Sequence, residues 1–172
     1  MRLFLSLIFL FSFGFSFAQD NYNAFRWKPT PALHEVEPAF RDAGAVYITD
    51  QRIVEYAFEK NQLYTYRTLH RIVHINNDQG IESFNKIYLP FNEGIELLDV
   101  KARTILPGGK IIELDKTNIK DLKDENGQYK IFALEGLVKG CELEYYFTIK
   151  KAPYFFWQGS AVVAYPGPVG TV

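Results

Sequence analysis

The chain has 172 residues, a formal net charge of −1 and a single cysteine. This near-neutral balance argues against nucleic-acid binding, which needs a basic face to displace counterions from phosphates. One thiol cannot form an internal disulfide, and a chain of this length is one domain that folds around a hydrophobic core.

The first eighteen residues predict a cleavable export signal. Arg2 carries the only charge, an apolar run covers residues 3–17, and small side chains at Ser16 and Ala18 suit a signal peptidase. The run is shorter than the roughly 20 apolar residues of a spanning helix. We predict cleavage between Ala18 and Gln19, a periplasmic or extracellular location and no membrane span after cleavage; the alternative is an uncleaved anchor.

Residues 19–43 predict an extended lead-in. Pro29, Pro31 and Pro38 occur among polar residues, with Phe25 and Trp27 as isolated apolar side chains. Proline fixes φ and removes a backbone donor, so this segment favours neither a helix nor a central strand.

Residues 44–160 predict an all-β fold, an antiparallel β-sandwich. Val54, Tyr56 and Phe58 point one way while Glu55 and Glu59 point the other, and in residues 142–150 four apolar side chains share one face: Leu143, Tyr145, Phe147 and Ile149. A period of two is typical of a half-buried strand. Turn residues at 106–110 predict a hairpin, those at 76–80 predict another turn, and the charged residues 116–125 predict a short helix or a loop.

No residue constellation predicts catalysis, a metal or a cofactor. Cys141 opens an alternating strand, not a helix, and all three histidines precede it, so we expect a packed thiol rather than a nucleophile. His70 and His74 would share a face of a helix, but the β-branched context predicts a strand. There the two lie about 13 Å apart and cannot share one ion.

The aromatic residues near the end of the predicted sandwich are candidates for a binding surface. Tyr146 falls among polar positions of its strand, and Tyr154, Phe156 and Trp157 follow a proline just beyond it. Such side chains suit a protein partner or a sugar. Packing in the core, or against a missing domain, is the alternative.

Several segments, in the order in which they occur along the chain, resemble a bacterial domain of unknown function of the DUF3857 type. They are Arg67-Thr68-Leu69-His70-Arg71-Ile72-Val73-His74-Ile75, Ile87-Tyr88-Leu89-Pro90, Leu106-Pro107-Gly108-Gly109-Lys110 and Gly140-Cys141-Glu142-Leu143-Glu144-Tyr145. The resembling domain precedes transglutaminase-like domains of cysteine-peptidase fold in exported proteins. The resemblance implies a β-sandwich in the cell envelope, with any catalytic residues in a domain further along the chain.

After Lys151 no residue is charged, and residues 161–172 form an uncharged tail. Because the resembling domain continues with further strands, we hypothesise a truncated sandwich; a short stand-alone version is the alternative. Three functions follow: a non-catalytic accessory module held by a protein partner, the front of a transglutaminase-like enzyme, or a carbohydrate- or peptide-binding module. A downstream reading frame encoding Cys, His and Asp in that order would favour the second.

Overall fold

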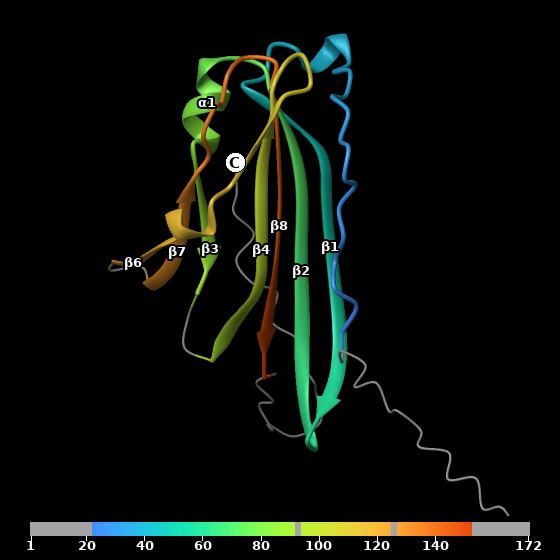
Figure 1. The fold of residues 1–172 in the computed structure, drawn as a ribbon, viewed down its shortest axis with the longest axis vertical. Helices are drawn as coiled ribbons and strands as arrows, with labels where there is room; N and C mark the ends of the chain where they lie inside the picture. The colour runs from blue at the N-terminus through green and yellow to red at the C-terminus, as the bar shows by residue number, and fades with distance from the viewer. Residues whose placement is uncertain (1–21, 92–93, 125–126, 153–172) are drawn as a thin grey trace, which may run out of the picture.

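The computed structural model describes residues 22–91, 94–124 and 127–152, which form two antiparallel β-sheets (Figure 1). A five-stranded sheet has the order β1-β2-β8-β4-β5, and a three-stranded sheet has the order β3-β7-β6. The strands are β1 (Ala45–Glu59), β2 (Gln62–Ile75), β3 (Lys86–Pro90), β4 (Ile95–Ile105), β5 (Ile111–Glu113), β6 (Lys120–Asp124), β7 (Gly127–Ala133) and β8 (Glu142–Lys151). The predicted all-β, antiparallel fold is confirmed.

The large sheet is built around the long β1–β2 hairpin, whose strands pair from Ala45 and Ile75 to Glu59 and Gln62. The turn has only two residues between the strands, Lys60 and Asn61, and both have positive φ. Two positive φ values match the primed turns whose twist suits a hairpin. In Figure 1 this hairpin extends past the neighbouring ends of β4 and β8.

The hydrophobic core lies between the two sheets. Alternation in β8 directs Leu143, Tyr145, Phe147 and Ile149 to the inner face of the large sheet, as predicted. The small sheet contributes the buried residues Ile87, Leu89 and Phe132. Burial of these side chains away from water is the main stabilising term of the fold.

The outer face of the large sheet is covered by the lead-in, residues 22–43, which Figure 1 shows as a blue trace along the sheet. A 3₁₀ turn, η1 (Pro38–Phe40), lies within it. Residues 142–149 are consequently buried on both faces. The prediction of a half-buried strand is therefore wrong for β8, because the lead-in takes the place of solvent.

Two loop predictions are also corrected. The residues predicted as a turn at 76–80 begin α1 (Asp78–Phe84), because the Asn77 side chain accepts from the backbone N–H groups of Gln79 and Gly80 and caps the helix. The charged residues 116–125, predicted as a short helix or a loop, begin with the short helix η2 (Lys116–Asn118) but continue as β6, which pairs with β7. The hairpin at residues 106–110 is confirmed, since it joins the paired strands β4 and β5.

None of the helices among the described residues is long and apolar enough to cross a membrane.

Candidate functional site

The outer face of the large sheet carries a row of ionisable side chains beneath the lead-in. Because β8 alternates, Glu142 and Glu144 point to the face opposite the core. The pairing of β8 with β2 and β4 brings His70, His74 and Arg103 to the same face. Glu142, Glu144 and Arg103 are at most 3% exposed, which is rare for charged residues unless they are paired.

Glu144 binds partners from two neighbouring strands. Arg103 donates from Nε to Oε2 at 2.7 Å, and His70 Nε2 lies 2.9 Å from Oε1. Burial alone would raise the pKa of Glu144, but the hydrogen bonds from His70 and Arg103, together with the charge of Arg103, hold the pKa below its usual value. Glu144 therefore stays ionised inside the protein.

Arg103 also fastens the lead-in to the sheet. Its guanidinium donates to the backbone carbonyl of Lys28 at 2.7 Å and lies over the Trp27 ring, 4.1 Å from the ring centroid. One arginine thus satisfies a buried carboxylate and holds the segment that covers it.

Glu142 forms a second cluster with two histidines. His34, from the lead-in, donates its backbone N–H to Oε1 at 2.6 Å, and its Nδ1 lies 2.9 Å from Oε2. His74 Nδ1 lies 3.2 Å from Oε1. Glu142 thus lies within hydrogen-bond distance of two imidazoles and accepts a backbone N–H from the lead-in.

Two cavities flank these clusters. A cavity of about 440 Å³ lies between the lead-in and the sheet, lined in part by Phe25, Trp27, His70, Arg103 and Glu144. His70 Nδ1 is buried there without a hydrogen-bond partner in the described structure.

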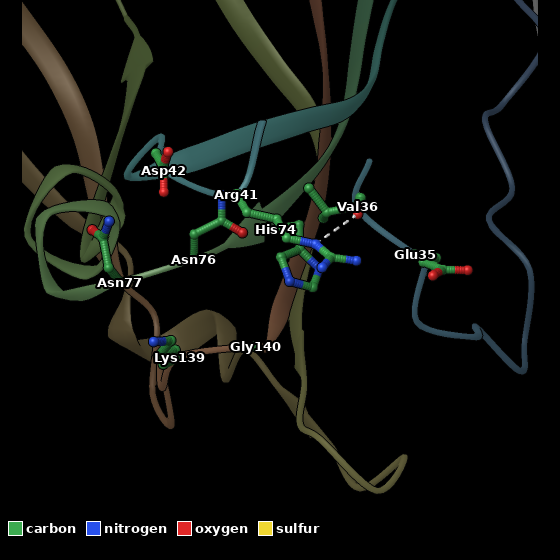
Figure 2. Close-up of a pocket in the computed structure, with 9 residues that line it drawn as sticks. All are labelled: Glu35, Val36, Arg41, Asp42, His74, Asn76, Asn77, Lys139 and Gly140. Carbon is green, nitrogen blue, oxygen red and sulfur yellow. Dashed lines mark hydrogen bonds between the residues drawn. The ribbon is translucent and has the colours of Figure 1, made fainter. Parts of the chain in front are cut away.

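The second cavity, of about 550 Å³, lies at the end of the sheet near η1 (Figure 2). It is lined by Glu35, Val36, Arg41, Asp42, His74, Asn76, Asn77, Lys139 and Gly140. Within it Arg41 Nε donates to the Val36 carbonyl at 3.4 Å. Its charged lining residues are of both signs, with Glu35 and Asp42 acidic and Arg41 and Lys139 basic.

Tyr146, which the sequence suggests as part of a binding surface, is buried at 2% exposure. Its hydroxyl donates to Asp99 Oδ2 at 2.7 Å, and the rings of Phe25 and Trp27 pack against it with centroids 4.8 and 5.4 Å away. Burial and the Asp99 carboxylate raise the pKa of this phenol. The expectation of an exposed Tyr146 is corrected, because the lead-in covers its polar strand face.

The other residues of that surface, Tyr154, Phe156 and Trp157, lie outside the described residues, as do Ala18 and Gln19 at the predicted cleavage site.

Cys141 lies directly before β8 in the core, with no exposed surface. Its Sγ accepts a hydrogen bond from the backbone N–H of Val138 at 3.4 Å. Burial raises the pKa of the thiol, which disfavours the thiolate that a nucleophile requires.

The predicted strand around His70 and His74 is confirmed. The two imidazoles bind different carboxylates, Glu144 and Glu142. Among the described residues no group of three or more His, Cys, Asp or Glu side chains is arranged to hold a metal ion.

These observations define an all-β sandwich module whose large sheet is covered by the core on one face and by an N-terminal segment on the other. The sequence profile of the domain of unknown function DUF3857 matches residues 53–170, and the chain belongs to this family.

The fold is similar to a solved structure described as a "putative protease" from Parabacteroides distasonis, with a TM-score of 0.54 and 9% sequence identity. The match covers 67% of this chain and 24% of that one, so this chain spans about a quarter of the longer protein. At this identity the similarity concerns the fold alone. No curated protein matches the chain.

Proposed function

We propose that this chain is an exported, non-catalytic module that works beside a catalytic domain or a partner protein. The observation that carries the proposal is that the histidines and the cysteine, the side chains most suited to catalysis, are occupied by contacts within the protein. The chain has three histidines and one cysteine. Each histidine contacts a buried glutamate, and the cysteine is enclosed in the core.

Nucleophilic catalysis would require a nucleophile within reach of a base and open to a substrate. The Glu144 carboxylate instead accepts from His70 and Arg103, and Glu142 accepts from His34 and His74. These hydrogen bonds form a network that connects the sheet to the lead-in, which supports a structural role. Cys141 has no exposed surface through which a substrate could reach it.

The similar solved structure supports the partner part of the proposal. A domain of this fold forms about a quarter of that chain, and the remainder offers room for a catalytic domain. On this proposal, the peptide-bond chemistry suggested by that protein's description would belong to such a domain and not to the sandwich.

Export is supported by Arg2, the apolar run at residues 3–17 and the small residues before Gln19. Mass spectrometry of the chain recovered from the envelope or medium should give a mature form that begins at Gln19. A mature chain that retains residues 1–18 would contradict cleavage.

The non-catalytic role is tested by assaying the purified chain and its Cys141→Ser variant on peptide, amide and ester substrates. We expect no turnover that depends on Cys141 or on any of the three histidines. Turnover that Cys141→Ser or His70→Gln abolishes, with folding intact by circular dichroism, would overturn the proposal.

A second candidate function, binding of a peptide or carbohydrate, is favoured by the cavity under the lead-in. Its aromatic lining and the unpartnered His70 Nδ1 could accommodate a ligand that carries a hydroxyl or amide group. Gln51→Trp would fill this cavity, whereas Arg52→Trp on the opposite face of β1 would not. Saturable binding in a glycan or peptide array that only Gln51→Trp removes would support this function.

A further inference from the structure

The β1 strand exposes an apolar stripe on its inner face. Val54, Tyr56 and Phe58 are 50%, 65% and 72% exposed. They alternate along one strand and therefore point to the same side of the sheet, opposite the lead-in. We call these three residues the β1 stripe.

The other face of the same hairpin is covered. Tyr22 stacks on Tyr66 with ring centroids 4.7 Å apart, and Asn23 Nδ2 donates to Glu55 Oε1 at 2.8 Å. The hairpin is thus covered by the lead-in on one side, while the described residues leave the β1 stripe bare on the other. A contiguous exposed patch of large apolar side chains marks a surface that is normally covered.

The strand register shows which segment lies nearest to the stripe. β8 ends at Lys151, which pairs with Thr65 of β2, and Thr65 pairs with Tyr56 of β1. Adjacent strands lie about 4.8 Å apart, so the chain leaves β8 roughly 10 Å from Tyr56 on the same sheet. Val54 pairs with Arg67 of β2, and Arg67 pairs with Ile149 of β8. Paired residues point to the same side of a sheet, and Ile149 lies in the core, so the stripe and the end of β8 share the inner face.

The residues that follow β8 have the composition to cover this surface. Residues 153–157 read Pro-Tyr-Phe-Phe-Trp, and no charged residue occurs between Ala152 and Val172. The family profile extends to residue 170, which places this segment within the domain. Four extended residues reach about 13 Å, enough to bridge the distance to the stripe.

We propose that the aromatic segment, residues 153–157, docks on the β1 stripe and completes the inner face of the large sheet. The stripe buries its apolar side chains against the rings of the segment, and the uncharged sequence avoids placing a charge against them. This assigns Tyr154, Phe156 and Trp157 to an internal surface of the module instead of to a partner-binding surface.

The test uses Trp157 as a probe in the whole chain. Trp27 and Trp157 are the only tryptophans, so Trp27→Phe leaves Trp157 as the sole indole. We expect its emission to be blue-shifted and shielded from acrylamide. Adding Tyr56→Glu and Phe58→Glu should raise the quenching constant severalfold. The matched control is Tyr88→Glu, which places the same charge at a 54% exposed residue of β3 and should leave quenching unchanged.

A Trp157 that is as quenchable as free tryptophan amide in the Trp27→Phe chain would overturn the proposal. A concentration-dependent dimer, detected by analytical ultracentrifugation and abolished by the stripe substitutions without a change at Trp157, would assign the stripe to a second copy and also overturn it.

Disulfide trapping provides a second readout if a glutamate variant fails to fold. The pair Tyr56→Cys and Trp157→Cys should form an intramolecular disulfide faster than the control pair Tyr88→Cys and Trp157→Cys. Equal rates for the two pairs would contradict docking.

Discussion

At the scale of single residues, the unusual feature is a set of buried charges placed outside the hydrophobic core. Arg103 is 1% exposed and contacts both a carboxylate and a backbone carbonyl. Removing one member of a buried ion pair is more disruptive than losing the attraction, because the remaining charge stays buried without its partner. The stability of this face therefore depends on complete pairing.

Arg103→Ala should lower the free energy of unfolding by about 3–5 kcal/mol, because it leaves Glu144 with His70 alone and frees the Lys28 carbonyl. Arg52→Ala is the matched control: Arg52 is exposed and pairs with Asp50 at 3.3 Å. Such a surface pair contributes about 0–1 kcal/mol. Urea denaturation measures both variants, and similar losses would contradict the structural role of Arg103.

Glu144 should also make the stability of the protein depend on pH. Its folded-state pKa lies below the unfolded value of about 4.5, so its stabilising contribution is fully present above that pH. The contribution is lost as the pH falls through the folded pKa. Glu144→Gln should therefore lower stability at neutral pH and flatten its decline below about pH 4.5.

Urea denaturation at a series of pH values measures this effect. Glu82→Gln removes an exposed carboxylate from α1. In this control the decline of stability at acid pH should be the same as in the unaltered chain. If the decline of stability at acid pH is unchanged in Glu144→Gln, the pH dependence does not arise from this carboxylate.

At the scale of elements, the sequence predicted strands best where one face packs on the core. The alternation of Leu143, Tyr145 and Phe147 identifies β8, and the Pro-Gly-Gly turn identifies the β4–β5 hairpin. The start of α1 was missed because an N-cap and a turn use the same residue types. β6 was missed because all five of its residues are exposed, so no alternation of burial marks it.

The candidate site was harder to predict than the strands. The sequence suggests Tyr146 as exposed, whereas the burial of Tyr146 depends on Phe25 and Trp27, more than a hundred positions earlier in the chain. The pairing of Glu142 with His74 depends on the register between β2 and β8. A single sequence shows the faces of each strand but not which strands are neighbours.

Close packing of α1 on the start of β1 leads to a prediction at this scale. A Cβ atom at Gly80 would lie 2.0 Å from the backbone carbonyl oxygen of Gly44. Gly80→Ala should therefore displace α1 and destabilise the protein by about 1–3 kcal/mol, as overpacked sites do. Glu82→Ala, at an exposed position of the same helix, is the control and should be near neutral. Thermal unfolding distinguishes them, and equal midpoints would contradict this close contact.

At the scale of the whole molecule, the large sheet is the middle layer of the fold. The small sheet packs on its inner face and the lead-in covers its outer face. This explains how one sheet buries apolar side chains on one side and ion pairs on the other. Residues 22–43 of the lead-in are therefore part of the domain, although the family profile begins only at residue 53.

Cys141 offers a probe of this architecture because it lies in the core between the two sheets with no exposed surface. A thiol reagent can reach it only when the sheets separate, so its labelling should require opening of the whole domain. Arg103→Ala disrupts the ion pair on the outer face, and Gly80→Ala disrupts the contact between α1 and Gly44. Both variants should be labelled faster than the unaltered chain, in proportion to their loss of stability.

Labelling with a chromogenic disulfide reagent measures this effect, with Arg52→Ala expected to behave like the unaltered chain. If opening and closing are fast relative to labelling, the rate follows the population of the open form. Fast labelling in every variant would indicate that the sheets separate locally. Acceleration by Gly80→Ala alone would mean that the lead-in and the core open independently, and the three layers would not form one cooperative unit.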